Sequence, residues 1–239
     1  MRALLRDAIT AGWMEEPSVK LRAGRIEADR RLFSFAREDL LPASRRRLAA
    51  LLERLNMPQP ETLLAQVSGS VAVHLGVEGA TRKCYLEFPA HARPEPALVY
   101  LAAKWRGGVL RHDLYLERAL LPAPERRALI AAVAPDDIAR TAAEALLGIA
   151  ERADPAGRPP LLEVLGAEDP RRSVDLNLAD AGRSLGSLAP VLAPVLDRTG
   201  AAGHAFLRAN AEAHLGHFAL GRDERGEGFV TLYFGAHRA

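Results

Sequence analysis

Ten segments of this chain alternate apolar and polar residues, and they fall into five pairs, most of them separated by turn residues. The pairs are 17–22 with 31–36, 69–78 with 82–89, 97–105 with 109–117, 161–165 with 172–179, and 215–221 with 228–234. Alternation with a period of two predicts β-strands, and short glycine-containing connections between such strands predict hairpins. We therefore expect about ten antiparallel strands, arranged as hairpins.

Segments with the period of an amphipathic helix lie between several of these hairpins. They cover 43–56, 124–133, 136–152, 184–198 and 202–213. In 136–152 the expected apolar stripe contains Ile138, Ala142, Leu146 and Ile149. Pro190 and Pro194 are expected to kink or interrupt the helix over 184–198. Hairpins and helix pairs that recur about every 45–60 residues indicate an internal repeat within one domain that spans 1–239.

The composition excludes several classes of protein. Hydrophobic residues make up 49% of the chain, which is enough for a core, and 32 basic against 30 acidic residues argue against a dedicated nucleic-acid binder. No apolar run reaches the roughly 18–20 residues of a membrane helix, and Arg6 and Asp7 interrupt the only N-terminal apolar stretch. The single Cys84 excludes an internal disulfide framework. We expect a cytoplasmic globular protein with neither a nucleic-acid nor a membrane partner.

Side-chain direction divides each predicted strand into an apolar face and a polar face. The apolar faces are expected to receive the helices. The polar faces carry all lysines and all tyrosines of the chain, namely Lys20, Lys83, Lys104, Tyr85, Tyr100, Tyr115 and Tyr233. Since 29 of the 32 basic residues are arginines, a merely solvated face would be expected to hold arginine instead.

Two architectures fit these strands. One is an open antiparallel sheet with helices on one side and a solvated polar face. The other, which we favour, is an α+β fold in which about ten strands close into an antiparallel β-barrel surrounded by amphipathic helix pairs. Closure removes the sheet edges and makes the polar face a lumen wide enough for a ligand.

Outer helix pairs, inner antiparallel hairpins and a lumen rich in lysine and tyrosine resemble the aromatic prenyltransferases of the ABBA, or PT-barrel, type. The local motif is Lys83-Cys84-Tyr85, which is similar to the Lys-x-Tyr strand pattern of the indole-prenylating branch; 231–234 keeps the tyrosine without the lysine. Two features depart from the family: 89–96 is too short for the helix pair expected there, and the chain is short. The resemblance therefore indicates the fold more strongly than the activity.

The resemblance implies transfer of a prenyl group from an allylic diphosphate to an indole or phenol, as in secondary metabolism, with a small molecule or a peptide as acceptor. Cations must stabilise the diphosphate leaving group. Lys83 matches the motif, and Lys20, Arg22, Lys104 and Arg111 are added from their strand faces. Tyr85, Tyr100, Tyr115 and Tyr233 can face the allylic cation. The proton acceptor is left open among Glu87, Asp113 and Asp175. The resemblance fixes no cofactor and leaves open whether a magnesium ion accompanies the diphosphate.

Other motifs give weaker evidence of function. His214 and His217, with His204, have metal-ligand character but undefined geometry, so we predict no metal site. His74 is expected to be a hydrogen-bonded residue of the polar face, and Cys84 a core residue.

Two alternatives to the enzyme remain. One is a non-catalytic barrel that binds an amphipathic small molecule or peptide, and the other is a partner-binding sheet. Convergence of three or more of the five predicted cations favours diphosphate binding.

Overall fold

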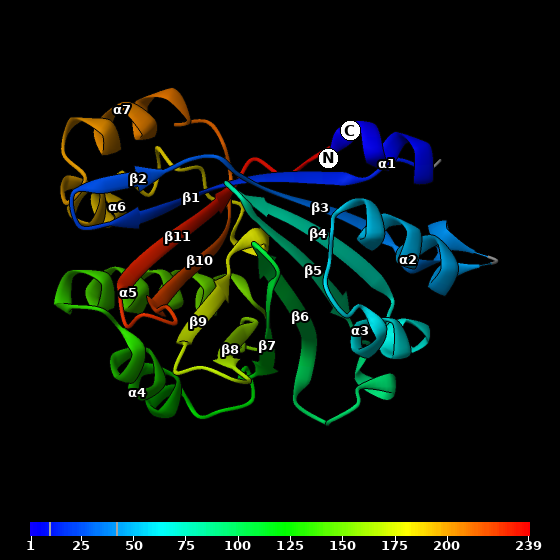
Figure 1. Cartoon of the computed structure of the whole chain (residues 1–239). Helices are drawn as coiled ribbons and strands as arrows, with labels where there is room; N and C mark the ends of the chain where they lie inside the picture. Colours follow the sequence, from blue (N-terminus) through cyan, green and yellow to red (C-terminus); the bar gives the residue numbers. More distant parts are fainter. Residues whose placement is uncertain (10, 42) are drawn as a thin grey trace. The chain divides into compact units, whose positions relative to one another are not determined.

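The computed structural model of the chain, shown in Figure 1, describes residues 1–9, 11–41 and 43–239, which form two compact units. The first unit contains Met1–Glu16, Arg30–Leu116 and His237–Ala239, and the second contains Pro17–Asp29 and Glu117–Ala236. Strand β1 (Met14–Arg22) begins in the first unit and ends in the second. The single domain expected over residues 1–239 stays a prediction.

The sheet of the first unit follows chain order. Its strands are β3 (Arg30–Ala36), β4 (Ala72–Glu78), β5 (Thr81–Glu87), β6 (Leu98–Arg106) and β7 (Val109–Glu117). Each strand pairs antiparallel with the next. Gly107 and Gly108 form the two-residue turn between β6 and β7, both with positive φ, at 57° and 83°. That backbone conformation matches the twist of a tight hairpin and favours glycine.

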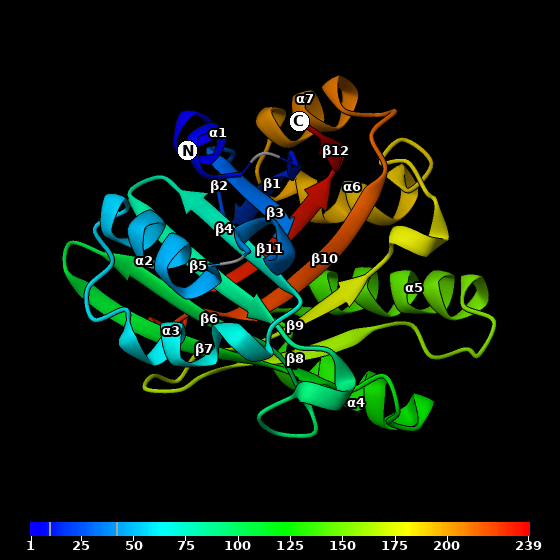
Figure 2. The same cartoon turned by 90° about the vertical axis from the view of Figure 1, so that its right-hand side faces the viewer.

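Helices cover the apolar face of this sheet. The unit contains α1 (Arg2–Ala8), α2 (Ser44–Arg54) and α3 (Glu61–Gln66), together with the short 3-10 turns Arg37–Leu40, Val67–Gly69 and Ala90–Ala92. Figure 2 shows α2 and α3 across β4 and β5. Leu48 and Leu52 of α2 pack in one core with Phe33, Leu75 and Leu86 of the strands. The expected helix over 43–56 is therefore confirmed, whereas α1 and α3 were not expected.

One side chain of the expected apolar face is displaced by a β-bulge. The register between β6 and β7 shifts between Leu98 and Tyr100. Leu98 is buried in the core as a result, and Val99, which strict alternation assigns to the apolar face, is only partly buried. A bulge adds one residue to one strand and so changes which side chain faces the core.

A buried carboxylate ties α1 to the strands of the first unit. The side chain of Glu15 on β1 is fully buried. Its carboxylate accepts two hydrogen bonds of 2.8 Å from Arg2 and one of 2.7 Å from Arg31. The hydrogen bond from Arg2 lowers the pKa of Glu15, against the effect of burial.

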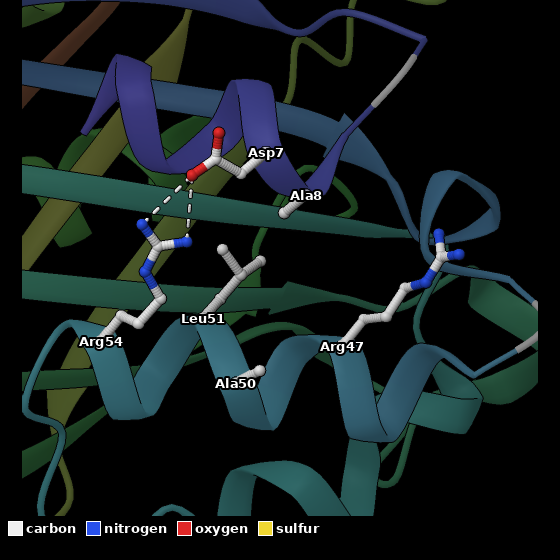
Figure 3. Close-up of a pocket in the computed structure, with 6 residues that line it drawn as sticks. All are labelled: Asp7, Ala8, Arg47, Ala50, Leu51 and Arg54. Atoms are coloured by element: carbon white, nitrogen blue, oxygen red, sulfur yellow. Dashed lines mark hydrogen bonds and ion pairs between the residues drawn. The ribbon is translucent and has the colours of Figure 1, made fainter.

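A cavity of about 330 Å³ lies between α1 and α2 (Figure 3). It is lined by Asp7, Ala8, Arg47, Ala50, Leu51 and Arg54.

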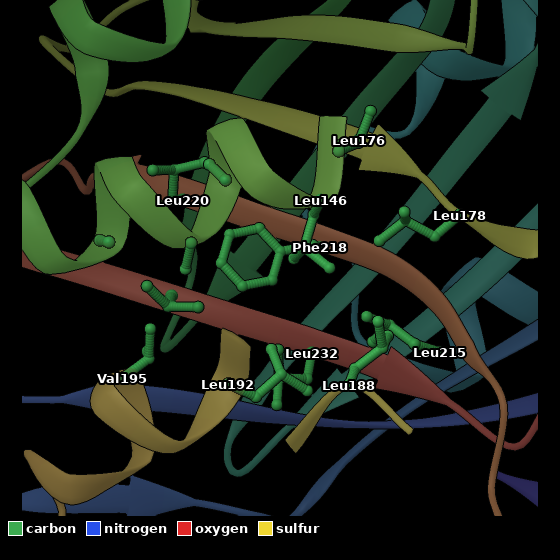
Figure 4. Packing of buried hydrophobic residues seen from close by; sticks show 14 of the residues in the cluster. Leu146, Leu176, Leu178, Leu188, Leu192, Val195, Leu215, Phe218, Leu220 and Leu232 are labelled. Atoms are coloured by element: carbon green, nitrogen blue, oxygen red, sulfur yellow. The ribbon is translucent and has the colours of Figure 1, made fainter. Parts of the chain in front are cut away.

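The second unit repeats the arrangement of hairpins and helices. Its strands pair in the order β8 (Leu161–Gly166), β9 (Arg172–Asn177), β10 (Leu215–Arg222), β11 (Gly228–Phe234), the end of β1, and β2 (Arg25–Glu27). Its helices are α4 (Ala123–Val133), α5 (Asp137–Ala153), α6 (Ala189–Asp197) and α7 (Ala201–Ala209). Figure 4 shows Phe218 of β10 packed among leucines of α5, α6 and the strands.

Four of the five predicted hairpins are confirmed as β4–β5, β6–β7, β8–β9 and β10–β11. The fifth predicted pair falls on β1 and β3, which are hydrogen-bonded neighbours in the sheet. The connection between them is not a simple turn, because it contains the short strand β2, which pairs with β1. Residues His237–Arg238 form a second unexpected short strand, β12, which pairs with the start of β1. The other long strands lie where the alternation predicts them.

Two helix predictions need correction. In α5 the buried residues include Ala139, Ala143, Leu146 and Leu147, whereas Ile138, expected on the apolar stripe, is 44% exposed. Ala142 and Leu146 of the expected stripe are buried, and the buried face extends from them to Ala139, Ala143 and Leu147 instead of to Ile138. The helix expected over 184–198 begins only at Ala189, with one proline in its first turn and Pro194 inside it. The N–H groups of the first helical turn have no partner within the helix. A proline, which has no N–H, therefore fits in this turn, and the helix starts there.

Among the residues that the structure describes, no helix is both long and apolar enough to cross a membrane.

We expect Leu146→Ala to lower the free energy of unfolding by about 2–5 kcal/mol, because Leu146 is fully buried and its loss leaves a cavity. Ile138→Ala in the same helix is the matched control and should change stability by less than about 0.5 kcal/mol, because Ile138 is exposed. Urea denaturation measures both. Equal losses in the two variants would contradict the helix orientation described above.

Candidate active site

Three of the five predicted cations lie in one row across the first unit. Lys83 of β5 is opposite Lys104 of β6, and Lys104 is opposite Arg111 of β7. Residues opposite each other on antiparallel strands have Cβ atoms about 4.5–5.5 Å apart, and like charges at such positions repel. Both lysines are buried, at 9% and 7% exposure, so this row is a concentrated positive charge with little solvent around it.

Two carboxylates partly balance the row. Glu78, the last residue of β4, forms ion pairs with Lys83 and with Arg30 of β3. Asp113 of β7 forms a buried ion pair with Lys104. Each lysine of the row therefore has a carboxylate partner on a neighbouring strand, and three cations still lie side by side. Clustered cations of this kind are what an anionic ligand requires.

Gly76 provides the space that the Lys83 side chain occupies. It lies directly opposite Lys83, and a Cβ atom added to it would be 3.1 Å from the Cβ and 3.3 Å from the Cδ of Lys83. The lysine stem consequently lies over β4, where it reaches Glu78.

A cluster of aromatic rings adjoins the cations. Tyr115 lies edge-to-face with Tyr85 and Tyr100, with ring centroids 5.7 and 5.8 Å apart, and the His74 ring is 5.5 Å from that of Tyr100. The Lys104 ammonium is 5.9 Å from the centre of the Tyr115 ring. The ring faces present electron density to a cation, and Lys104 shows that they accept one.

The three proposed proton acceptors have different surroundings. Glu87 accepts a hydrogen bond of 3.0 Å from His74, whose other ring nitrogen is 2.7 Å from the Ser34 hydroxyl. This bond from His74 lowers the pKa of Glu87, while burial acts in the opposite direction. Asp113 is ion-paired with Lys104, and Asp175, in the second unit, is 2.9 Å from His217. His74 is hydrogen-bonded, as expected from the sequence.

The remaining predicted residues lie on the second unit. The Lys20 ammonium and the Arg22 guanidinium, both on β1, lie 5.2 and 6.0 Å from the centre of the Phe229 ring. The Arg171 guanidinium lies 5.3 Å from the same centre. Arg22 is also ion-paired with Asp223 at 2.7 Å. Tyr233 is 5.9 Å from the His217 ring.

Sequence reasoning did not identify Arg30, Ser34, Glu78, Arg171 or Phe229. Two of them contact predicted residues directly: Glu78 is ion-paired with Lys83, and the Phe229 ring lies against Lys20 and Arg22. Arg30 contacts Glu78, Arg171 contacts Phe229, and Ser34 is hydrogen-bonded to His74. Glu78 ends the strand expected over 69–78 and is the last residue of β4. The signal that was available for Ser34 and Arg30 was their shared strand face.

The histidine motif forms no metal site. His217 is paired with Asp175, His204 with Asp197, and His214 lies in a bridge to Ser184. In the described part of the chain, no three His, Cys, Asp or Glu side chains are grouped so that they could hold a metal ion. Cys84 is fully buried in the core, and burial raises the pKa of its thiol far above the ordinary value. The cavity between α1 and α2 contains none of the predicted site residues.

Solved structures share the arrangement of most of this chain. PriB, in a binary complex with product diphosphate, is 17% identical with a TM-score of 0.64, and the match covers 92% of this chain and 79% of that one. The 5-dimethylallyltryptophan synthase from Streptomyces coelicolor is 16% identical with a TM-score of 0.63, and the match covers 92% of this chain and 80% of that one. AnaPT from Neosartorya fischeri is 16% identical with a TM-score of 0.58, and the match covers 92% of this chain and 77% of that one. This chain has the PT-barrel fold.

The PT-barrel fold confirms the predicted fold class, an antiparallel barrel built from hairpins and surrounded by helices, and it excludes the open sheet. The Streptomyces PT barrel has also been solved in complex with DMASPP and Trp. No protein-family model matches this sequence, and no curated protein matches it either.

We expect Asp113→Asn to lower the free energy of unfolding by about 3–5 kcal/mol, because it removes the charge that pairs with the buried Lys104 ammonium. Replacing both residues by apolar ones, Lys104→Met with Asp113→Leu, should recover most of that loss, since an ion pair buried in protein gains little over good apolar packing. Chemical denaturation measures both variants. A cost below about 1 kcal/mol for Asp113→Asn would show that the pair is effectively solvated.

Proposed function

We propose that this protein transfers a prenyl group from an allylic diphosphate to an aromatic acceptor. The observation that carries the proposal is the row of Lys83, Lys104 and Arg111 beside the edge-to-face rings of Tyr85, Tyr100 and Tyr115. A diphosphate needs cations such as those of the row, and an allylic cation needs electron-rich faces such as those of the tyrosine rings. The shared fold supports the proposal.

The chemistry assigns a role to each group. As the allylic C–O bond breaks, its electron pair leaves with the diphosphate, and the cation row stabilises the charge that accumulates on the departing oxygens. The tyrosine rings face the allylic carbon, which is positive at that stage, and the low dielectric of the buried site strengthens both interactions. An aromatic carbon of the acceptor then bonds to the allylic carbon, and a carboxylate takes the proton that the ring loses.

The acceptor is proposed to be an indole or a phenol, as a small molecule or part of a peptide. Crystals of the Streptomyces relative with DMASPP and Trp support an indole as the first acceptor to test. Lys20, Arg22, Asp175 and Tyr233 of the second unit remain proposed substrate-binding or base residues on the ground of their strand face alone. A magnesium ion is proposed only as a companion of the diphosphate.

A second function is favoured by one observation. Lys83 and Lys104 already have carboxylate partners in Glu78 and Asp113, as expected of a structural network. The protein would then be a non-catalytic barrel that binds an amphipathic small molecule or peptide. Diphosphate binding and turnover distinguish the two functions.

Inorganic pyrophosphate should stabilise the protein against heat. At one hundred times the dissociation constant, binding contributes about 2.7 kcal/mol, which for a chain of this size corresponds to roughly 5–10 °C in Tm. The shift should shrink as sodium chloride increases, because salt screens the ionic contacts. Differential scanning fluorimetry measures the shift. A double variant, Lys83→Gln with Lys104→Gln, should lose it; an unchanged Tm of the wild type at millimolar pyrophosphate in low salt would contradict diphosphate binding.

Lys83→Ala should lower kcat by roughly 10- to 150-fold, because a charge-assisted hydrogen bond that strengthens in the transition state contributes about 1.5–3 kcal/mol. Tyr85→Phe should lower kcat by a smaller factor than Lys83→Ala, since the aromatic ring remains. The assay is prenylation of indole and phenol acceptors with several allylic diphosphates, followed by chromatography and mass spectrometry.

The matched control for Lys83→Ala is Arg82→Ala. Arg82 precedes Lys83 on β5, is opposite Trp105 of β6 and therefore points to the other face. Its loss should leave kcat unchanged. If Lys83→Ala and Arg82→Ala are both as active as the wild type, Lys83 has no part in the reaction.

A further inference from the structure

Three polar side chains form a hydrogen-bonded chain across neighbouring strands of the first unit. The Ser34 hydroxyl on β3 is 2.7 Å from Nδ1 of His74 on β4, and Nε2 of His74 is 3.0 Å from a carboxylate oxygen of Glu87 on β5. The resemblance and the proposed function assign no role to Ser34 or His74. Serine, imidazole and carboxylate in this order are a common way of orienting a proton-transfer group.

The register places this chain beside the tyrosines. His74 is opposite Ser34 on one side and Tyr85 on the other. Glu87 is opposite Ala72 on β4 and Tyr100 on β6. Because the neighbour on β4 is a small alanine, the His74 ring can reach Glu87 diagonally. Glu87 therefore shares a face with the three rings that the proposed function assigns to the allylic cation.

The hydrogen-bonding capacities determine which atoms carry protons. An ionised carboxylate can only accept, so Nε2 of His74 must donate to Glu87. In the neutral imidazole Nδ1 then has a lone pair, and the Ser34 hydroxyl donates to it. Glu87 thereby selects the tautomer in which Nε2 carries the hydrogen, and Ser34 holds the other side of the ring by donating to Nδ1. This arrangement explains why His74 lowers the pKa of Glu87 even though burial raises it.

The partner of Glu87 distinguishes it from the nearby carboxylate. Asp113 is 2% exposed and ion-paired with an ammonium, whereas the Glu87 side chain is 32% exposed and hydrogen-bonded to an imidazole. A carboxylate that is ionised, directed and still accessible can take a proton from a substrate. Asp113 would first have to give up its pairing with Lys104.

We infer that His74, whose ring is held by the hydrogen bond with Ser34, is a positioning residue that makes Glu87 the proton acceptor of the reaction. The inference rests on the proposed function. When the new carbon–carbon bond has formed, the ring C–H bond breaks, its electron pair restores aromaticity, and the proton moves to Glu87, which becomes a carboxylic acid. The exposed part of Glu87 then releases the proton to water, and the diphosphate leaves as the second product.

The pH dependence of kcat tests the inference. The acceptor must be ionised, so activity is lost as the pH falls through the pKa of Glu87. His74→Ala removes the N–H donor and leaves the effect of burial unopposed, which raises the pKa of Glu87 and moves the acid limb to higher pH. The phenols on the same face as Glu87 are those of Tyr85 on its own strand and of Tyr100 directly opposite on β6, with Tyr115 opposite Tyr100 on β7.

Three further variants separate positioning from folding. His74→Gln supplies an amide N–H and should restore the wild-type acid limb, while Glu87→Gln should lower kcat about 100- to 10,000-fold at every pH. His217→Ala is the comparison for the other carboxylate–imidazole pair, Asp175 with His217. If His217→Ala moves the acid limb and His74→Ala does not, Asp175 is the acceptor and the inference is wrong.

A second measurement is independent of turnover. In protein labelled with ¹³C at the glutamate carboxyl carbon, the Glu87 resonance, assigned by its absence from Glu87→Gln, should titrate at higher pH in His74→Ala than in the wild type. Identical titration in both proteins overturns the role of His74, whether or not the protein is active. Absence of prenylated product from the wild type with every donor refutes the proposed function, and with it the role of Glu87 as acceptor.

Discussion

Strands that bury leucine on one face can hold buried charge on the other, and the candidate site of this protein depends on that division. In the first unit, Leu75 and Leu86 pack against α2 and α3, and this contact stabilises the strands independently of what the opposite face carries. The opposite face can then hold Lys83 next to Lys104, although like charges at opposite positions of a sheet repel. The ion pairs with Glu78 and Asp113 reduce this repulsion.

Much of this could be predicted from the sequence, because alternation along a strand fixes which residues share a face. It identified Lys83, Tyr85, Tyr100, Lys104 and Arg111 as one set. Alternation does not give register, so it could not show that Lys83 pairs with Glu78, or that Glu87 reaches His74 diagonally past Ala72. Nor did periodicity find the centre of the buried face of α5, where the small Ala139 and Ala143 are buried and the larger Ile138 is exposed. The short helices α1 and α3 contain too few turns to show a period.

The two units repeat more than their secondary structure. In the first, Glu87 is bound to His74, which lies against Tyr100; in the second, Asp175 is bound to His217, which lies against Tyr233. A carboxylate, an imidazole and a phenol are thus associated twice, on different strands. Clusters of cations also occur twice, around Lys104 and around Phe229. Similar local chemistry at both places is what duplication of a hairpin and helix unit would produce.

The scarcity of lysine gives this protein an intrinsic chemical reporter. Its three lysines all lie on the polar faces of strands, and all three are buried. An amine-selective acylating reagent therefore reacts with lysine side chains only at these faces. Peptide mass mapping after brief acylation would consequently measure the accessibility of Lys20, Lys83 and Lys104 separately, without an engineered label.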